Sequence, residues 1–159
     1  MAGELIGAVA VATALGAALV GGIFFAFSSF VMAALGRLRP EQGIAAMQSV
    51  NLTVINPWFF AVFFGTALGA AALAVPGIIY GGAPGSAWLL SGSLLYLFGC
   101  ILVTMLFNVP LNDALAAVEP DSTEGAGLWA GYLATWTRWN HLRTVASLAA
   151  AASFIMAIR

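Results

Sequence analysis

Four long apolar stretches, almost free of charged residues, limit what this chain can fold into. A helix needs about 20 apolar residues to cross a hydrocarbon core of about 30 Å. Three of the stretches reach that length, and the fourth reaches it if its helix begins near Trp136. Inside lipid every backbone N–H and C=O must be paired within its own segment, so these stretches are expected to be helices. They cover residues 5–35, 56–79, 87–107 and 144–158.

The sequence therefore predicts an all-α fold, an integral membrane four-helix bundle embedded in the lipid bilayer. Charged residues make up 7% of the chain, whereas a soluble domain carries about 25%. The 159 residues leave room for four spans and short loops but not for a second soluble domain. We expect a single domain over residues 1–159, with helices over about 5–35, 44–79, 87–107 and 128–158 and a short helix over about 110–118.

Prolines and asparagines predict where these helices are interrupted. Pro40 disfavours helical backbone at the residue before it and so ends the first helix. Asn56 and Pro57 fit a kink or a restart, because a proline costs little in a first helical turn. Pro110 cannot donate to the carbonyl four residues back, so the third helix is expected to break there, with Asn108 capping a new short helix.

The few arginines predict an orientation in the membrane. With four spans, one side holds the loop over residues 36–43 and the loop over 108–143. Arginines are enriched on the cytoplasmic side, so these loops are expected there, with both termini outside the cell membrane. The net charge of −1 offers no basic footprint for nucleic acid. Arg37, Arg39, Arg138 and Arg143 belong to the loop side, and Arg159 to the other.

Small residues recur at every fourth position in the first two spans. Such ridges allow helix backbones to approach closely in lipid. They serve either packing inside one bundle or a face between two copies, so a homo-oligomer stays open. The ridges are Ala10, Ala14, Ala18, Gly22 and Ala26 in the first span, and Ala61, Gly65 and Gly69 in the second.

Metal ligands are sparse in the sequence. One histidine, no Glu-x-x-His pattern and no paired carboxylates at helical spacing provide no ligand set, so neither a metal nor another cofactor is expected. The single cysteine, Cys100, lies in the middle of the third stretch and is interpreted as a small core residue.

The most polar segment of the sequence lies at residues 136–144, at the start of the fourth span. At about 100° per residue, Asn140 and His141 share one helix face, and Trp136, Trp139 and Arg143 share another. Buried amides need partners, and ionisable groups at membrane depth mark functional sites. We therefore expect one pocket for a polar-headed ligand, although capping also accounts for Asn56 and Asn108, anchoring for the tryptophans, and a structural role for the histidine. The polar residues near span ends on this side are Asn51, Asn56, Asn108, Asn112, Asn140, His141 and Arg143.

Four segments of the chain resemble a known family. They read GIFFAFSSFVM at residues 22–32, AMQSVN at 46–51 followed by Asn-Pro at 56–57, FNVPLN at 107–112, and WTRWNHLRT at 136–144. This text resembles the anthrone oxygenase-like membrane protein family over nearly the whole chain, and the last two segments are the specific ones. The resemblance implies a membrane protein related to fungal enzymes that oxidise anthrones to anthraquinones without a known metal or flavin.

The polar residues suit such an oxygenase. An anthrone has acidic C–H bonds, and its anion can react directly with O₂ once a base and an oxyanion donor are supplied. The expected base is His141 with a neutral imidazole. Asn108, Asn112, Asn140 or Arg143 would hold the oxyanion. The small hydrophobic aromatic substrate would contact Asn51, Asn56, Phe24, Phe27, Trp136, Trp139 and Asn140.

A second interpretation stays open beside the enzyme. The same polar cluster could belong to a non-catalytic small membrane subunit or a ligand-binding protein, in which amides and one arginine fix the geometry of the bundle. A single histidine among amides fits either interpretation.

Overall fold

The computed structural model describes residues 2–159, and over these residues it contains helices and no strands. Three helical segments are long and apolar enough to cross a membrane: Gly3–Leu35, Pro57–Ile79 and Ser86–Ala116. The all-α membrane bundle expected from the sequence is confirmed. The fourth long helix, α7 (Thr123–Ala157), has 35 residues but is not among these three, because the polar segment around Arg143 lies in its middle.

The first long segment is continuous from α1 (Ala2–Ala26) through the π-helical turn η1 (Phe27–Val31) to α2 (Met32–Leu35). Pro40 then starts α3 (Pro40–Thr53). The helix expected over 44–79 is in fact two helices, because Asn56 caps a new start. Its Oδ1 accepts from the Phe59 N–H at 3.0 Å and its Nδ2 donates to the Thr53 carbonyl at 2.9 Å. The second of the two helices is α4 (Pro57–Ile79).

The third long segment does not break at Pro110, contrary to the expectation. It runs through α5 (Ser86–Leu94), η2 (Leu95–Leu102), η3 (Thr104–Asn108) and α6 (Val109–Ala116). The wider π-helical turn before the proline explains the difference. The Val109 N–H donates to the Thr104 carbonyl five residues back, and Asn108 makes no side-chain cap. Pro110 then falls in the first turn of α6, where its missing N–H costs little.

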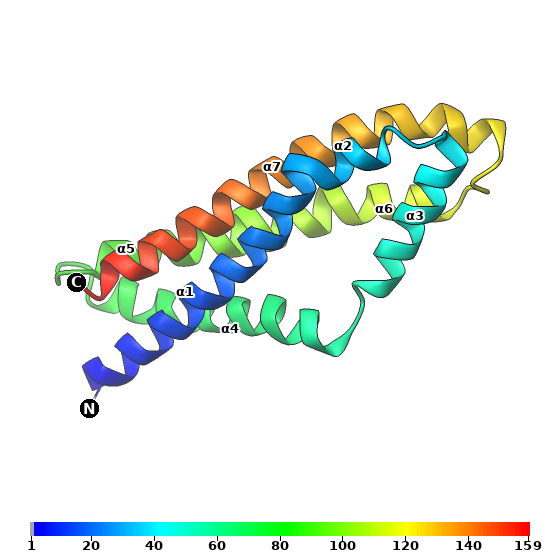
Figure 1. The fold of residues 1–159 in the computed structure, drawn as a ribbon. Coiled ribbons are helices and arrows are strands. Elements are labelled where there is room, and N and C mark those ends of the chain that lie inside the picture. The colour runs from blue at the N-terminus through cyan, green and yellow to red at the C-terminus, as the bar shows by residue number, and fades with distance from the viewer. Residues whose placement is uncertain (1) are drawn as a thin grey trace.

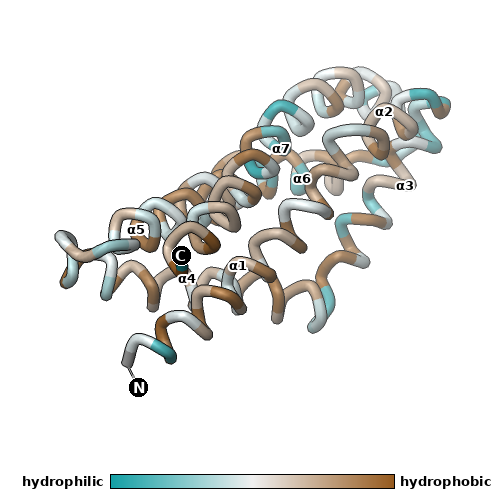
Figure 2. The backbone as a smooth tube through the Cα atoms, turned by 60° about the vertical axis from the view of Figure 1, so that its left-hand side comes forward, coloured by the Kyte–Doolittle hydropathy of each residue, from teal (hydrophilic) through white to brown (hydrophobic). Residues whose placement is uncertain are grey.

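The helices pack into one elongated bundle (Figure 1). α1 packs against α4 and α7, and α5 packs against α4 and α7, whereas α3 and α6 pack with the first half of α7. α4 contacts α1, α5 and η2 but does not pack extensively against η3 or α6. Figure 2 shows hydrophilic residues gathered around α2, α3, α6 and the start of α7, while α4 is largely hydrophobic. The bundle is therefore closed at one end and parted between α4 and α6 at the other.

The expected small-residue ridge of the first span is only partly inside the bundle. Ala10 and Ala14 are buried, whereas Ala18 and Gly22 are exposed. The tightest approach of α1 to α4 occurs instead at Gly16, where a Cβ would collide with Thr66. The reciprocal contact is between Gly69 and Thr13, so each glycine makes room for a threonine of the other helix.

Candidate functional site

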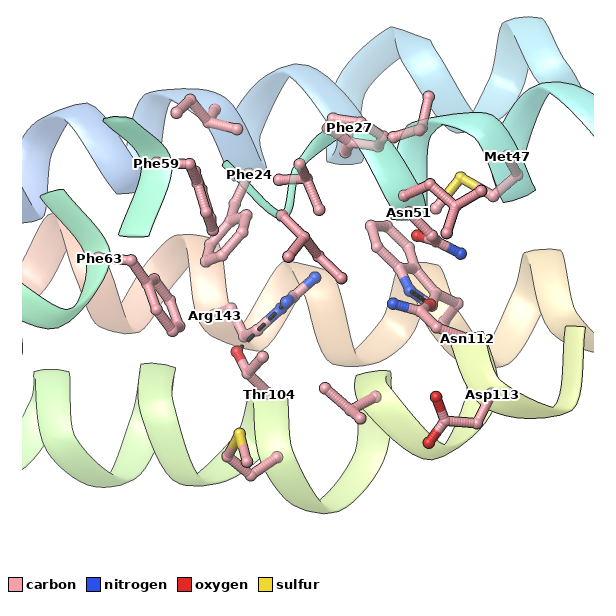
Figure 3. Close-up of a pocket in the computed structure, with 18 of the residues that line it drawn as sticks. Phe24, Phe27, Met47, Asn51, Phe59, Phe63, Thr104, Asn112, Asp113 and Arg143 are labelled. Atoms are coloured by element: carbon pink, nitrogen blue, oxygen red, sulfur yellow. Dashed lines mark hydrogen bonds between the residues drawn. The ribbon is translucent and has the colours of Figure 1, made fainter. Parts of the chain in front are cut away.

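A cavity of about 630 Å³ lies where α4 and α6 part. This volume falls within the range of about 300–1,000 Å³ that is usual for small-molecule sites. Its wall is mostly apolar, with polar groups from α3, η3, α6 and α7 (Figure 3). The lining residues used below are Phe24, Phe27, Asn51, Phe59, Phe60, Phe63, Phe64, Thr104, Met105, Asn112, Asp113, Trp136 and Arg143.

Arg143 places a positive charge in the wall of this cavity. Its side chain is 4% exposed, and its Cζ lies 4.1 Å from the centre of the Phe24 ring and 5.1 Å from that of Trp136. Aromatic faces attract a guanidinium, but they do not neutralise it. No acidic side chain within residues 2–159 forms an ion pair with Arg143. Buried charges are normally paired, so this guanidinium is chemically suited to bind an anionic group of a ligand.

Two neutral side chains fix the direction of Arg143. Its Nη2 donates to Asn140 Oδ1 at 2.7 Å, and its Nη1 donates to Thr104 Oγ1 at 3.2 Å. Asn140 is held in turn by α1 and η1, because its Nδ2 donates to the Phe24 carbonyl at 2.7 Å and to Ser28 Oγ at 2.8 Å. Asn140 is fully buried and does not line the cavity. It therefore positions Arg143 rather than offering a ligand contact.

Asn112 is a second fixed polar group, on the α6 side. Its Oδ1 accepts from the Tyr132 hydroxyl at 2.9 Å and from Trp136 Nε1 at 2.8 Å. With the oxygen held by two donors, the orientation of the amide is set, and Nδ2 is directed away from them. Asn51 lies nearby on α3, and its buried Nδ2 makes no hydrogen bond within the described chain. Both amides line the cavity, so each can offer an N–H to an oxygen of a ligand.

His141 does not belong to this site, which corrects the expectation that it lines the cavity with Asn140. Trp136, Asn140, Arg143 and Ser147 are buried and follow one another at intervals of three or four residues, which makes them one face of α7. His141 and Arg138 lie on the opposite, exposed face. The sorting of faces expected from the sequence was wrong, because the core takes Trp136 and Arg143 together with Asn140.

Three other expected site residues also lie outside the cavity. Trp139 stacks on Phe107 with ring centres 3.7 Å apart and makes no part of the lining. Asn56 is the cap of α4 described above. Asn108 is buried and donates from Nδ2 to the Trp136 carbonyl at 3.2 Å, which ties the end of η3 to α7. The structure thus brings together Phe24, Phe27, Asn51, Asn112, Trp136 and Arg143 from the expected set.

Asp113 is a lining residue that was not anticipated from the sequence. It follows Asn112 on α6, is exposed, and is the one carboxylate among the described residues around the cavity. Its position next to Asn112, in the short helix after Pro110, is the feature of the sequence that could have indicated it. Thr104 and the α4 phenylalanines Phe59 and Phe63 were also not anticipated, because residue type alone does not separate a cavity wall from packing or lipid contact.

Within residues 2–159, no group of three or more His, Cys, Asp or Glu side chains is placed to hold a metal ion. Cys100 is buried in the core formed by α1, α4, η2 and α7.

A comparison with protein families gives one match. The family model described as anthrone oxygenase matches residues 57–153, which span α4, α5 to α6, and most of α7. This stretch includes Thr104, Asn112, Asp113, Trp136 and Arg143, and it leaves out the α1 and α3 residues of the cavity. No curated protein and no solved structure matches the chain.

Proposed function

Because the chain belongs to the anthrone oxygenase family, we propose that it is a membrane-embedded oxygenase that oxidises an anthrone-like phenolic substrate with O₂. The substrate is flat, hydrophobic and able to form an enolate. The cavity beside Arg143 supports this proposal, because it combines an aromatic wall with one uncompensated positive charge.

The observation that carries the proposal is the isolated charge of Arg143. A ground-state ketone is neutral, but loss of a proton from the carbon opposite its carbonyl leaves negative charge on the carbonyl oxygen. A fixed guanidinium in an apolar cavity stabilises that anion far more than it stabilises the neutral ketone. Asn140 and Thr104 hold the guanidinium in place before the charge develops, so little reorganisation is needed during the reaction.

The proton is assigned to Asp113. It replaces His141 in this role, because His141 lies on the exposed face of α7 and Asp113 lines the cavity. Asp113 accepts the proton from the methylene carbon, and the electron pair moves onto the carbonyl oxygen near Arg143. A base near the reacting carbon contributes about 10²- to 10⁴-fold to such a step.

The remaining steps need only O₂ and the same groups. The enolate reduces O₂ and forms a C–O bond at the deprotonated carbon, and the peroxide formed takes the proton back from Asp113. Loss of the second C–H proton, with cleavage of the O–O bond, gives the quinone carbonyl and releases water. In total, one anthrone and one O₂ give one anthraquinone and one water. Asn51 and Asn112 would hold further substrate oxygens through their Nδ2 groups.

The test is oxygen consumption by the purified protein in lipid nanodiscs with anthrone as substrate. We expect stoichiometric O₂ uptake and anthraquinone formation in the parent, and a loss of about 10²-fold or more in Asp113→Asn. Asp121→Asn, in the exposed loop before α7, is the matched control and should keep the parent rate. A parent that turns over while Asp113→Asn is equally active would remove Asp113 from the mechanism but not the oxygenase.

A second function, a non-catalytic membrane subunit or ligand-binding protein, has one specific observation in its favour. Asn140 donates to the Phe24 carbonyl and to Ser28, contacts that join α7 to α1 and η1 with no ligand involved. If no O₂ uptake occurs with anthrone in the parent, and removal of Arg143 unfolds the bundle, this structural interpretation replaces the enzyme.

A further inference from the structure

The opening of the cavity lies between two membrane-spanning segments. Phe60 and Phe64 of α4 line the cavity and are 41% and 44% exposed. Across from them, Met105 of η3 lines the cavity and is 53% exposed. These residues fall inside the candidate spans Pro57–Ile79 and Ser86–Ala116. An opening bordered by two candidate spans faces lipid wherever those spans cross the hydrocarbon region.

The packing of the bundle leaves this opening free. α4 is held by α1, α5 and η2, but it does not pack extensively against η3 or α6. α3 closes the cavity from another side, because Gln48 Nε2 donates to the carbonyls of Leu115 at 2.9 Å and Val118 at 3.0 Å. The loosely packed side of the cavity is therefore the one between α4 and η3.

The opening changes in character along its length. Between Phe64 and Met105 its border is apolar, whereas the end near α3 carries the exposed carboxylate of Asp113. A molecule passing between the helices would keep its apolar rings in the hydrocarbon region, with Arg143 in the wall ahead of it (Figure 3). A lipid chain would satisfy the apolar border but would bring nothing for the guanidinium.

We propose that the cavity is loaded sideways from the bilayer, through the portal between α4 and η3, by a flat aromatic molecule dissolved in the membrane. This inference rests on the proposed function and adds the source of the substrate: the reaction draws on the pool dissolved in lipid. The Phe60, Phe64 and Met105 side chains form the portal, and Met105 controls its width.

The test measures binding rather than turnover, so that it can fail independently of the oxygenase. Parent protein in nanodiscs is mixed with 9,10-anthraquinone, and quenching of tryptophan fluorescence is followed by stopped flow, since Trp136 lines the cavity. Met105→Trp narrows the portal without touching Arg143. We expect association and dissociation both to slow by about tenfold, with a Kd within about twofold of the parent, because a gate changes rates and not equilibrium.

The matched control is Leu106→Trp. Leu106 neighbours Met105 on η3 and is 56% exposed, but it does not line the cavity. It adds the same indole, and both rates should stay at the parent values. Equal association rates in Met105→Trp and the parent would overturn the proposed portal. The absence of any anthraquinone binding in the parent would also overturn it, and lipid chains would then be the occupant of the gap between α4 and η3.

A water-soluble probe separates the two sources of ligand. Anthraquinone-2-sulfonate carries a permanent charge and is kept out of the hydrocarbon region. We expect it to bind at least tenfold more slowly than anthraquinone, although its sulfonate suits Arg143. Binding of the sulfonate as fast as anthraquinone, and equally fast in Met105→Trp, would show entry from water and refute the lateral route.

Discussion

The two faces of α7 around Arg143 have nearly the same kinds of residues and opposite environments. The inner face carries the buried Trp136, Asn140 and Arg143, the outer face carries the exposed Arg138 and His141, and the half-buried Trp139 lies at the border between the two faces. Each face thus has one arginine and one further polar residue, yet only the inner set is hydrogen-bonded into the bundle beside the cavity. Residue type alone does not define a site in a membrane helix. The rotation of the helix decides which set becomes buried.

The largest expected difference in activity is between variants of the two arginines, Arg143 and Arg138. Arg143→Met removes the buried charge while keeping an apolar side chain between Phe24 and Trp136, and Arg138→Met removes an exposed charge from the same helix. We expect kcat for anthrone to fall by about 10²- to 10³-fold in Arg143→Met, as it does when an oxyanion donor is removed. Arg138→Met should keep the parent kcat.

Thermal unfolding in detergent shows whether a variant loses activity merely because it is unfolded. Arg143→Met removes a buried charge but leaves the buried Asn140 Oδ1 without its donor, so we expect the free energy of unfolding to fall by no more than about 1–3 kcal/mol, with the bundle still folded. An active Arg143→Met protein with the parent rate would show that the charge is not used in the reaction. Arg143→Lys keeps the charge but loses the paired Nη contacts, so its kcat should lie between that of Arg143→Met and that of the parent.

Asn140 and His141 are neighbours in the chain, and substitutions of these two residues should give the next largest difference, in stability. Asn140→Leu leaves Arg143 Nη2 and the Phe24 carbonyl without their partner, so we expect a loss of about 1–3 kcal/mol in the free energy of unfolding. His141→Gln changes an exposed side chain, and its effect should stay within about 0.5 kcal/mol. Chemical denaturation in mixed micelles measures both.

Activity gives the same pair a second, independent readout. Asn140→Leu should lower kcat without a matching change in KM, because Asn140 acts through Arg143 and not on the substrate. His141→Gln should retain the parent pH profile. A loss of turnover in His141→Gln would restore the histidine as a base and would place the reacting carbon outside the cavity beside Arg143.

Much of the fold follows from the sequence, because backbone groups in lipid have few ways to be paired. The apolar runs alone indicate helices, and Asn56-Pro57 indicates a new start at α4. The polar end of the bundle is also visible, since five asparagines near span ends point to it. Phe24, Asn51, Asn112 and Arg143 were among the residues expected at the site, and they line the cavity.

The rest depends on rotations that the sequence does not encode locally. The π-helical turns η1, η2 and η3 use more residues per turn, so they shift which side chains face the core beyond them. This shift carries the third segment through Pro110 without a break and brings Asp113 to the cavity. α7 has no π-helical turn, but its polar segment allows two faces, and only packing against α1 and η3 selects the one with Arg143.

The two tryptophans test the smallest difference between the faces. Trp139→Ala removes the stack with Phe107 at the border of the outer face, with an expected loss of about 0.5–1.5 kcal/mol in stability and no change in KM. Trp136→Phe keeps an aromatic ring on the inner face but removes the Nε1 donor to Asn112, which should cost a similar amount, about 0.5–1.5 kcal/mol.

The measurement that distinguishes the two tryptophan variants is therefore KM for anthrone. With Trp136 replaced, the amide of Asn112 retains only the Tyr132 hydroxyl and is free to turn, so KM should rise by a few-fold while kcat changes little. If both variants raise KM equally, then Asn112 is not held for the substrate, and the inner face of α7 serves the ligand only through Arg143.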